Sequence, residues 1–190
     1  MVNALVAGSG IQVKLDQAAV TLPATGEAAQ LSVSAGTHQL VLLSSAGHSY
    51  GTVSFSISAD SSRTVVVSGG LDTAVVTVAA DTATATPLTG HILLVNSAPG
   101  VGPFDVYVYR ANVDSTLHFG GFSFSSGTQP GSPYRWSFPF NPGTYTFDVT
   151  APGSTTPLAS AVLTLATADE WTVVLTQAGS GSLALTATKQ

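Results

Sequence analysis

The stretch NPGTYTFDVTAPGS at residues 141–154 decides the fold, because a weaker copy of it, SAGTHQLVLLSSAG, occupies residues 34–47. In both copies a Gly-Thr pair follows a turn, a strand of alternating apolar and polar residues comes next, and small residues form a second turn. The agreement continues downstream, where residues 54–70 match residues 161–179. An internal repeat of this length predicts two copies of one β unit.

Apolar and polar residues alternate with period two along nearly the whole chain, with Gly, Pro, Ser or Asp at the breaks. This pattern predicts short strands and almost no helix. A chain of 190 residues is long enough for two such units, each with its own core. We therefore predict an all-β fold of two tandem immunoglobulin-like or transthyretin-like β-sandwich domains. Residues 1–80 form the first domain, residues 81–90 the linker and residues 91–190 the second domain.

The second copy differs from the first by an addition at residues 111–133, where we predict an extra hairpin or a long loop of the kind that often carries function. The predicted strands of the first copy are Val2–Val6, Ile11–Leu15, Ala29–Val33, His38–Leu43, Thr52–Ser58, Thr64–Ser68 and Ala74–Ala79. Those of the second copy are His91–Val95, Asp105–Tyr109, Tyr134–Phe140, Thr144–Thr150, Ala159–Leu165, Thr172–Thr176 and Leu183–Thr188.

The composition excludes several classes of function. Charged residues make up 8% of the chain, about a third of the usual share. Five basic against ten acidic residues argue against a nucleic-acid partner, and no apolar run approaches the roughly 18 residues of a membrane span. Cysteine is absent, which removes disulfides and thiolate chemistry. Low charge with abundant Ser and Thr predicts an extracytoplasmic protein, secreted or on the cell surface, whose signal or lipid anchor is not in this sequence.

The order VNSAPG, FDVYVY, NPGTYTFDVTAPGSTTPL and EWTVVLT resembles a bacterial and archaeal surface family, the domain of unknown function 4397. The resemblance covers the second copy almost end to end and the first in degenerate form. It implies exported or lipid-anchored proteins with tandem β-sandwich copies and no assigned activity. This chain has Gly100 where the family often has an acidic residue, and Gln12 in the first copy where the second has Asp105. Any site built on those acids is therefore absent from the first copy.

Residues 47–51, GHSYG, match the G-x-S-x-G motif of hydrolase nucleophiles. That motif requires a helix after the serine, whereas the following GTVSFSIS predicts a strand. We therefore predict a hairpin turn and a protein that is not an enzyme. An esterase-like enzyme that uses Ser49 remains the hypothesis to eliminate.

The histidines lie on separate predicted strands and loops, without the spacing of metal ligands. His118 and Asp114 form the best pair, because both belong to the addition, and Asp105 is a further candidate ligand. Surface histidines are the favoured interpretation, and we predict no metal site and no cofactor. The four histidines are His38, His48, His91 and His118.

Twelve of the fifteen aromatic residues lie between Phe104 and Phe147. Those of residues 134–140 occupy alternate positions and share one face of a strand, which favours their burial in the second core. The alternative is an aromatic platform at the rim that stacks on sugar rings or anchors a protein partner. Its candidate residues are Phe119, Phe122, Phe124, Tyr134 and Trp136.

The first copy begins later than the second. A whole predicted strand precedes Asn96, whereas only Met1 and Val2 precede Asn3. Either a longer chain supplies this strand, or the first domain has an open sheet edge that recruits another strand. In the second case we expect self-association, with the C-terminal LALTATKQ of a neighbouring subunit as the donor.

These features favour a non-enzymatic structural or adhesive module of a cell surface or an extracellular assembly. Such a module self-associates through its sheet edges or binds another surface protein. The alternative is a glycan- or peptide-binding module that uses the aromatic residues of the addition.

Overall fold

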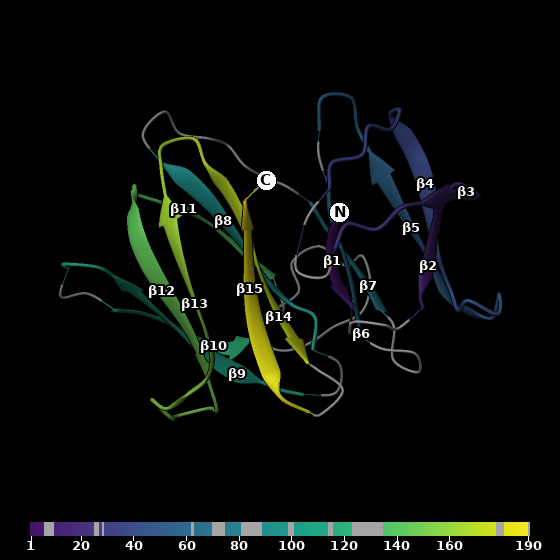
Figure 1. The fold of residues 1–190 in the computed structure, drawn as a ribbon. Coiled ribbons are helices and arrows are strands. Elements are labelled where there is room, and N and C mark those ends of the chain that lie inside the picture. Colours follow the sequence, from purple (N-terminus) through teal and green to yellow (C-terminus); the bar gives the residue numbers. More distant parts are fainter. Residues whose placement is uncertain are drawn as a thin grey trace.

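The computed structural model shows strands joined by turns, with no helix among the residues it describes. These strands form four sheets (Figure 1), which confirms the all-β prediction. Residues rich in Val, Thr and aromatic side chains pack well on such pleated surfaces. The described residues are 1–5, 10–24, 27, 29–61, 63–69, 75–80, 89–98, 101–113, 116–122, 135–177 and 181–189.

The strands β1 to β7, here called the first unit, form two sheets with the orders β1-β6-β7 and β3-β2-β4-β5. β1 runs parallel to β6, and the other neighbouring strands are antiparallel. The bounds are β1 Val2–Leu5, β2 Gln12–Leu15, β3 Ala18–Val20, β4 Gly36–Leu43, β5 Ser49–Ile57, β6 Arg63–Gly69 and β7 Val75–Ala80.

The strands β8 to β15, here called the second unit, form sheets with the orders β11-β8-β14-β15 and β10-β9-β12-β13. β8 runs parallel to β14, as β1 does to β6, so the two units share one strand order. The bounds are β8 Gly90–Asn96, β9 Phe104–Arg110, β10 Thr116–Phe122, β11 Arg135–Phe140, β12 Gly143–Thr150, β13 Pro157–Leu165, β14 Glu170–Gln177 and β15 Leu183–Lys189.

Each unit encloses its own apolar core between its two sheets. Leu40 and Leu42 of β4 are buried in the first core, and Phe147 and Val149 of β12 are buried in the second. The residues between them on each strand are more exposed. The period of two in the sequence therefore separates core from surface.

A third apolar cluster joins the two units. Val66 of β6 is fully buried against Leu93 and Val95 of β8 and Val174 of β14. The sheet that contains β6 thus packs its outer face on the sheet that contains β8 and β14. Residues 81–88 of the predicted linker lie outside the described residues.

Two asparagines show the repeat at the level of single hydrogen bonds. The Oδ1 atoms of Asn3 and Asn96 each accept a bond from the backbone amide two residues further along, at 3.1 and 3.0 Å. Their Nδ2 atoms donate to the carbonyls of Pro23 and Phe122, at 2.7 and 3.1 Å. Asn3 lies within β1 and Asn96 is the last residue of β8, and both side chains are buried. The predicted alignment of the two Val-Asn pairs is confirmed.

Gly36 and Gly143 begin the equivalent strands β4 and β12. Their φ angles are +149° and +159°, a conformation that side chains other than glycine rarely adopt. A Cβ at Gly143 would also approach Nε of Arg110 to 2.8 Å. The two Gly-Thr pairs of the repeat therefore occupy equivalent positions in the two units.

The addition predicted at residues 111–133 is in part a regular strand. Its residues 116–122 form β10, which pairs antiparallel with β9 as β3 pairs with β2. β10 is therefore the longer counterpart of β3 and not an extra hairpin. The sequence pattern does not predict β3, because three residues are too few to show alternation. Residues 123–134 lie outside the described residues.

We predict that Asn96→Ala lowers the free energy of unfolding by roughly 2 to 5 kcal/mol, because two buried backbone groups lose their partners. Urea denaturation followed by tryptophan fluorescence measures the change. The control is Asn141→Ala, whose side chain is exposed and should change stability by less than about 0.5 kcal/mol. Equal effects of the two substitutions would contradict a structural role for the Asn96 bonds.

Candidate strand-binding groove

Among the described residues, β6 of the β1-β6-β7 sheet extends past the start of β1. In the second unit, β8 is paired with β11 on one side and β14 on the other. β1 is shorter, and its pairing with β6 begins at Val66. Residues Arg63–Val65 of β6 therefore extend past the start of β1. Across from them, no described strand occupies the place that Gly90–Leu93 hold in the second unit.

Residues 29–33 form the opposite wall of this groove. Ala29 and Met1 exchange two backbone hydrogen bonds, of 2.8 and 2.6 Å. Past Ala29 the chain continues along the groove, and residues 30–33 make no hydrogen bond to another described residue. The prediction of a strand at Ala29–Val33 is therefore wrong. A strand needs a partner along its length, and this segment has one only at Ala29.

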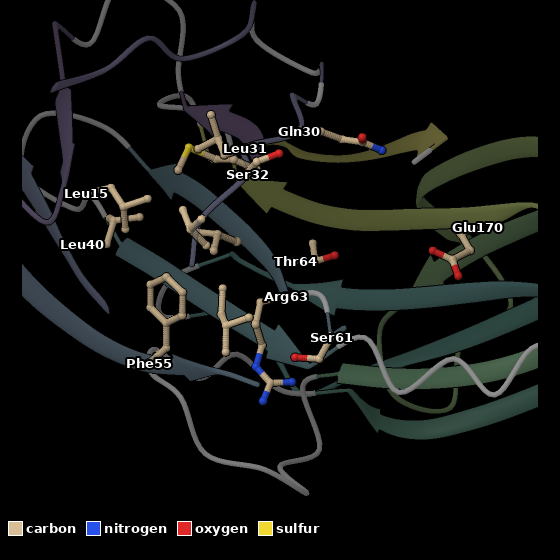
Figure 2. Close-up of a pocket in the computed structure, with 14 residues that line it drawn as sticks. Leu15, Gln30, Leu31, Ser32, Leu40, Phe55, Ser61, Arg63, Thr64 and Glu170 are labelled. Atoms are coloured by element: carbon tan, nitrogen blue, oxygen red, sulfur yellow. The ribbon is translucent and has the colours of Figure 1, made fainter. Parts of the chain in front are cut away.

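Between the two walls lies a cavity of about 420 Å³ (Figure 2). Its apolar floor comes from the facing sheet, with Leu15 on β2, Leu40 on β4 and Phe55 on β5. Arg63 and Glu170 contribute charged side chains to the lining. Figure 2 shows Glu170 at one end of the space, away from the apolar residues. The groove thus combines an apolar interior with a polar mouth.

One wall exposes two large apolar side chains. Leu31 and Val33 are 43% and 37% exposed. Counting along the ladder from the Ala29–Met1 pair, Val33 corresponds to Phe140, which pairs with Gly90 and is 7% exposed. The difference follows from Gly90–Leu93, which cover this position in the second unit. A strand placed in the groove would cover Leu31 and Val33 in the same way and pair with both walls.

His38 holds the wall of the groove in place. Its Nδ1 lies 2.6 Å from Oδ2 of Asp16, in the β2–β3 turn, and its Nε2 lies 2.9 Å from the carbonyl of Ser34. Asp16 also accepts a bond from the amide of Gln39. An imidazolium carries two N–H donors and satisfies both acceptors. The prediction of surface histidines is therefore wrong for His38, which is 5% exposed.

These contacts shift the ionisation of both partners. The hydrogen bond to Asp16, helped by the Ser34 carbonyl, raises the pKa of His38 above its ordinary value. The same bond, together with the Gln39 amide, lowers the pKa of Asp16. In the second unit Tyr145 takes the place of His38, and its hydroxyl donates to the carbonyl of Asn141 at 2.7 Å. The first unit thus uses a charged pair where the second uses a neutral phenol.

Of the aromatic residues predicted as a binding platform, the structure describes the side chains of Phe119 and Phe122. Phe122 faces the second core and is fully buried, so its assignment to a binding surface is wrong. Phe119 is half-buried, with its side chain against that core. Phe124 and Tyr134 lie outside the described residues, as does the side chain of Trp136. Phe140 is buried, as the core interpretation predicts.

Phe119 does line a second cavity, of about 280 Å³, at one end of the second unit. Leu117 and Val113 beside it are 48% and 43% exposed. Arg110 borders the cavity and donates to the carbonyl of Pro142 at 2.6 Å. This cavity is the described feature closest to the predicted aromatic site.

Sequence reasoning missed an aromatic row on the outer face of the second unit. The alternation in FDVYVY places Tyr107 and Tyr109 on the same side of β9 as Asp105. His118 stacks on Tyr107 with 4.5 Å between ring centroids, and Tyr107 lies 6.5 Å from Tyr109. Because the His118 and Tyr107 rings face each other, these faces are not presented to a ligand.

His118 pairs with Asp105, and Asp114, its other predicted partner, lies outside the described residues. Nε2 of His118 is 3.3 Å from Oδ2 of Asp105. The amide of Gly153 donates to the same carboxylate at 2.8 Å, and this bond lowers the pKa of Asp105. Within the described part of the chain, no three His, Asp or Glu side chains meet in a metal-binding group. The pair therefore ties the β9–β10 hairpin to the loop at Gly153.

Ser49 begins β5, and the strand continues to Ile57. The prediction that a strand and not a helix follows the serine is confirmed. A nucleophile elbow needs that helix, so the GHSYG segment lacks the required local structure.

Comparison with protein-family models and with curated proteins gives no match. The resemblance to the domain of unknown function 4397 therefore stays a prediction. None of the described residues forms a helix that would be long and apolar enough to cross a membrane.

The charged His38–Asp16 pair predicts a pH-dependent stability. Because the pKa of His38 is raised, its contribution is complete below the unfolded value of about 6.5 and is lost as pH rises through the folded pKa. Because the pKa of Asp16 is lowered, its contribution is present above about 3.9 and is lost as pH falls through the folded pKa. We therefore expect the denaturant midpoint of the chain to fall as the pH rises above about 6.5 and through the raised pKa of His38.

The matched variant is His38→Tyr, which copies the residue that the second unit uses. We expect its midpoint to change less than that of the parent chain over the same pH range. NMR titration of the His38 ring measures its pKa directly. A His38 pKa at or below the ordinary value would contradict the role of the pair.

Proposed function

We propose that this chain is a non-enzymatic structural or adhesive module of two tandem immunoglobulin-like or transthyretin-like β-sandwich domains. It acts outside the cytoplasm, secreted or at a cell surface, in an extracellular assembly. It self-associates through its sheet edges, or binds another surface protein. The resemblance to the domain of unknown function 4397 is part of this proposal.

The groove beside β1 is the observation that carries the proposal. Its walls expose Leu31 and Val33, and its floor is built from Leu40 and Phe55. An exposed sheet edge with apolar side chains recruits a further strand, and main-chain hydrogen bonds then hold the partner. Association by an added strand requires no catalytic group, cofactor or metal.

The C-terminal strand was the expected donor, but it is paired within its own chain. β15 is seven residues long and pairs with β14 from Leu183 to Lys189. Nζ of Lys189 also lies 2.7 Å from Oδ1 of Asp169. Donation of β15 would break these contacts, so the donor is a segment that lies free in the partner.

The alternative function is a glycan- or peptide-binding module. The 280 Å³ cavity of the second unit favours it, because Phe119 and Tyr145 line that cavity beside the cationic Arg110. In this case the partner binds the second unit and the groove is not used. Screening of glycan and peptide arrays with the parent chain and with Phe119→Ala tests this alternative. A ligand whose binding is lost in Phe119→Ala would support it.

The assembly proposal predicts concentration-dependent association. We expect the weight-average mass in static light scattering to rise with concentration for the chain as it stands. A variant with Gly-His-Ile-Leu added before Met1 carries the residues that fill this place in the second unit, and should associate less. The control carries Gly-Ser-Gly-Ser instead and should behave as the parent. A parent chain that stays monomeric at high concentration would rule out self-association.

A further inference from the structure

We propose that the second unit binds an organic carboxylate with an apolar body, and that the 280 Å³ cavity between β10 and β11 is its site. The guanidinium of Arg110 receives the carboxylate, and Val113 and Leu117 cover the apolar part. This inference goes beyond the proposed assembly, and it narrows the ligand of the alternative function to one chemical class.

The cavity lies on the core side of the second unit, where β10 and β11 are edge strands of the two sheets. Leu117 of β10 lies opposite Val108 of β9, which belongs to the core. Directly opposed residues of a strand pair face the same side of the sheet, so Leu117 also faces the core side. Leu117 is nevertheless 48% exposed. The described residues therefore leave this corner between the two sheets open.

Arg110 reaches the same cavity from the end of β9. It follows Val108 by two residues and lies opposite Tyr145, so its side chain is on the core side as well. The guanidinium carbon lies 5.9 Å from the centre of the Tyr145 ring, and Nη2 donates to the carbonyl of Pro142 at 2.6 Å. A Cβ at Gly143 would come within 2.8 Å of Nε, so glycine leaves the room that the guanidinium occupies. These neighbours hold the cation at the wall of the cavity.

The positive charge of Arg110 has no carboxylate partner among the described residues. The ion pairs of the described acidic side chains are made with His38, His118 and Lys189. A guanidinium carries several N–H donors in a planar fork, and the bond to Pro142 uses a single nitrogen. A carboxylate matches this fork with two parallel hydrogen bonds. Charge complementarity therefore favours an anionic group in the ligand.

The rest of the lining favours an apolar body. Val113 is 43% exposed beside Leu117, and Phe119 and Phe140 line the cavity further in. Covering these side chains removes apolar surface from water. The Tyr145 hydroxyl is already bonded to a backbone carbonyl, so the lining offers few hydrogen-bond partners to a sugar ring. A carboxylate on a branched aliphatic body fits both the charged and the apolar part of the wall.

The first unit does not repeat this site. Leu15 pairs with Leu40 as Val108 pairs with Phe147, so the alignment places Gln17 at the position of Arg110. Gln17 carries no charge. The substitution Arg110→Gln therefore copies the first unit and serves as the matched variant.

Titration of the full chain with isocaproate, followed by amide chemical shifts in NMR, tests the proposal. We expect saturable shifts at residues of the β9–β10 hairpin. Isocaproamide has the same body without the charge and should bind at least about tenfold more weakly. Equal binding of the acid and the amide overturns the proposal.

Acetyl-Gly-Leu with a free carboxyl group distinguishes the two sources of such a carboxylate. If it binds at least as tightly as isocaproate, the ligand is the carboxyl end of a polypeptide. If isocaproate binds and the acetylated dipeptide does not, the ligand is a free organic acid. Binding of neither compound overturns the proposal.

Substitutions locate the site. Arg110→Gln should weaken isocaproate binding at least about tenfold and remove the preference for the acid over the amide. Arg63→Gln alters the arginine of the other cavity and should change binding less than about twofold. Leu117→Asp keeps the contacts of Arg110 but places a carboxylate at the mouth of the cavity, and it should weaken binding as strongly. Binding that Leu117→Asp leaves unchanged overturns the site.

Asp114 is near Arg110 in the sequence and is a possible competitor for its charge. Asp114→Asn should change isocaproate binding less than about twofold, and a rise of about tenfold would overturn the unpaired charge on which the site rests. Light scattering measures self-association without any ligand, so a failure of isocaproate to bind leaves the proposed assembly intact. A neutral glycan that Phe119→Ala no longer binds would keep the alternative function and overturn the carboxylate.

Discussion

The parallel pairing of β6 with β1, and of β14 with β8, is the constraint on which each unit depends. The first strand of each unit has a neighbour on either side, so its backbone groups are satisfied only if it spans the sheet. Asn3 of β1 and Asn96 of β8 each accept the same buried hydrogen bond from the amide two residues further along. Where the strand is complete, the core beneath it is closed. Where the first strand is shorter, as β1 is, the strand pairing, the apolar core and the two walls of the groove are interrupted at the same place.

Sequence reasoning recovers the strands in which apolar and polar residues alternate. The strands from β4 to β8 and from β11 to β15 follow from alternation, and the repeat aligns Gly36 with Gly143. It fails where the conformation of a segment depends on the segment that it pairs with or packs against. Ala29–Val33 has the composition of a strand, but it lacks a pairing partner past Ala29. Phe122 follows two glycines and was predicted to lie in a loop, but the register shift of β10 between Phe119 and Phe122 turns its side chain into the core. The alignment of the two copies predicts the shorter first strand. The cavity depends on side chains of the facing sheet, which the sequence alone does not place.

The two units stabilise the same turn by different chemistry. Tyr145 reaches the carbonyl four residues before it with a neutral hydroxyl, and His38 reaches the corresponding carbonyl of Ser34 with a ring that Asp16 keeps charged. Identical backbone geometry thus tolerates a phenol or an ion pair. In the first unit this geometry depends on pH, because the raised pKa of His38 and the lowered pKa of Asp16 bound the range in which the pair is ionic. His38 thus holds in place residues 29–33, which form one wall of the groove.

Natural proteins usually protect an open sheet edge with charged side chains or proline. The second unit has Pro139 on β11, although that strand is already paired with β8. The groove of the first unit has no such protection along residues 30–33, which are Gln, Leu, Ser and Val. Leu31 and Val33 remain exposed there, at a free-energy cost that only burial removes. Along residues 30–33 this edge therefore carries aliphatic and uncharged polar side chains, and the charges near it come from Arg63 and Glu170.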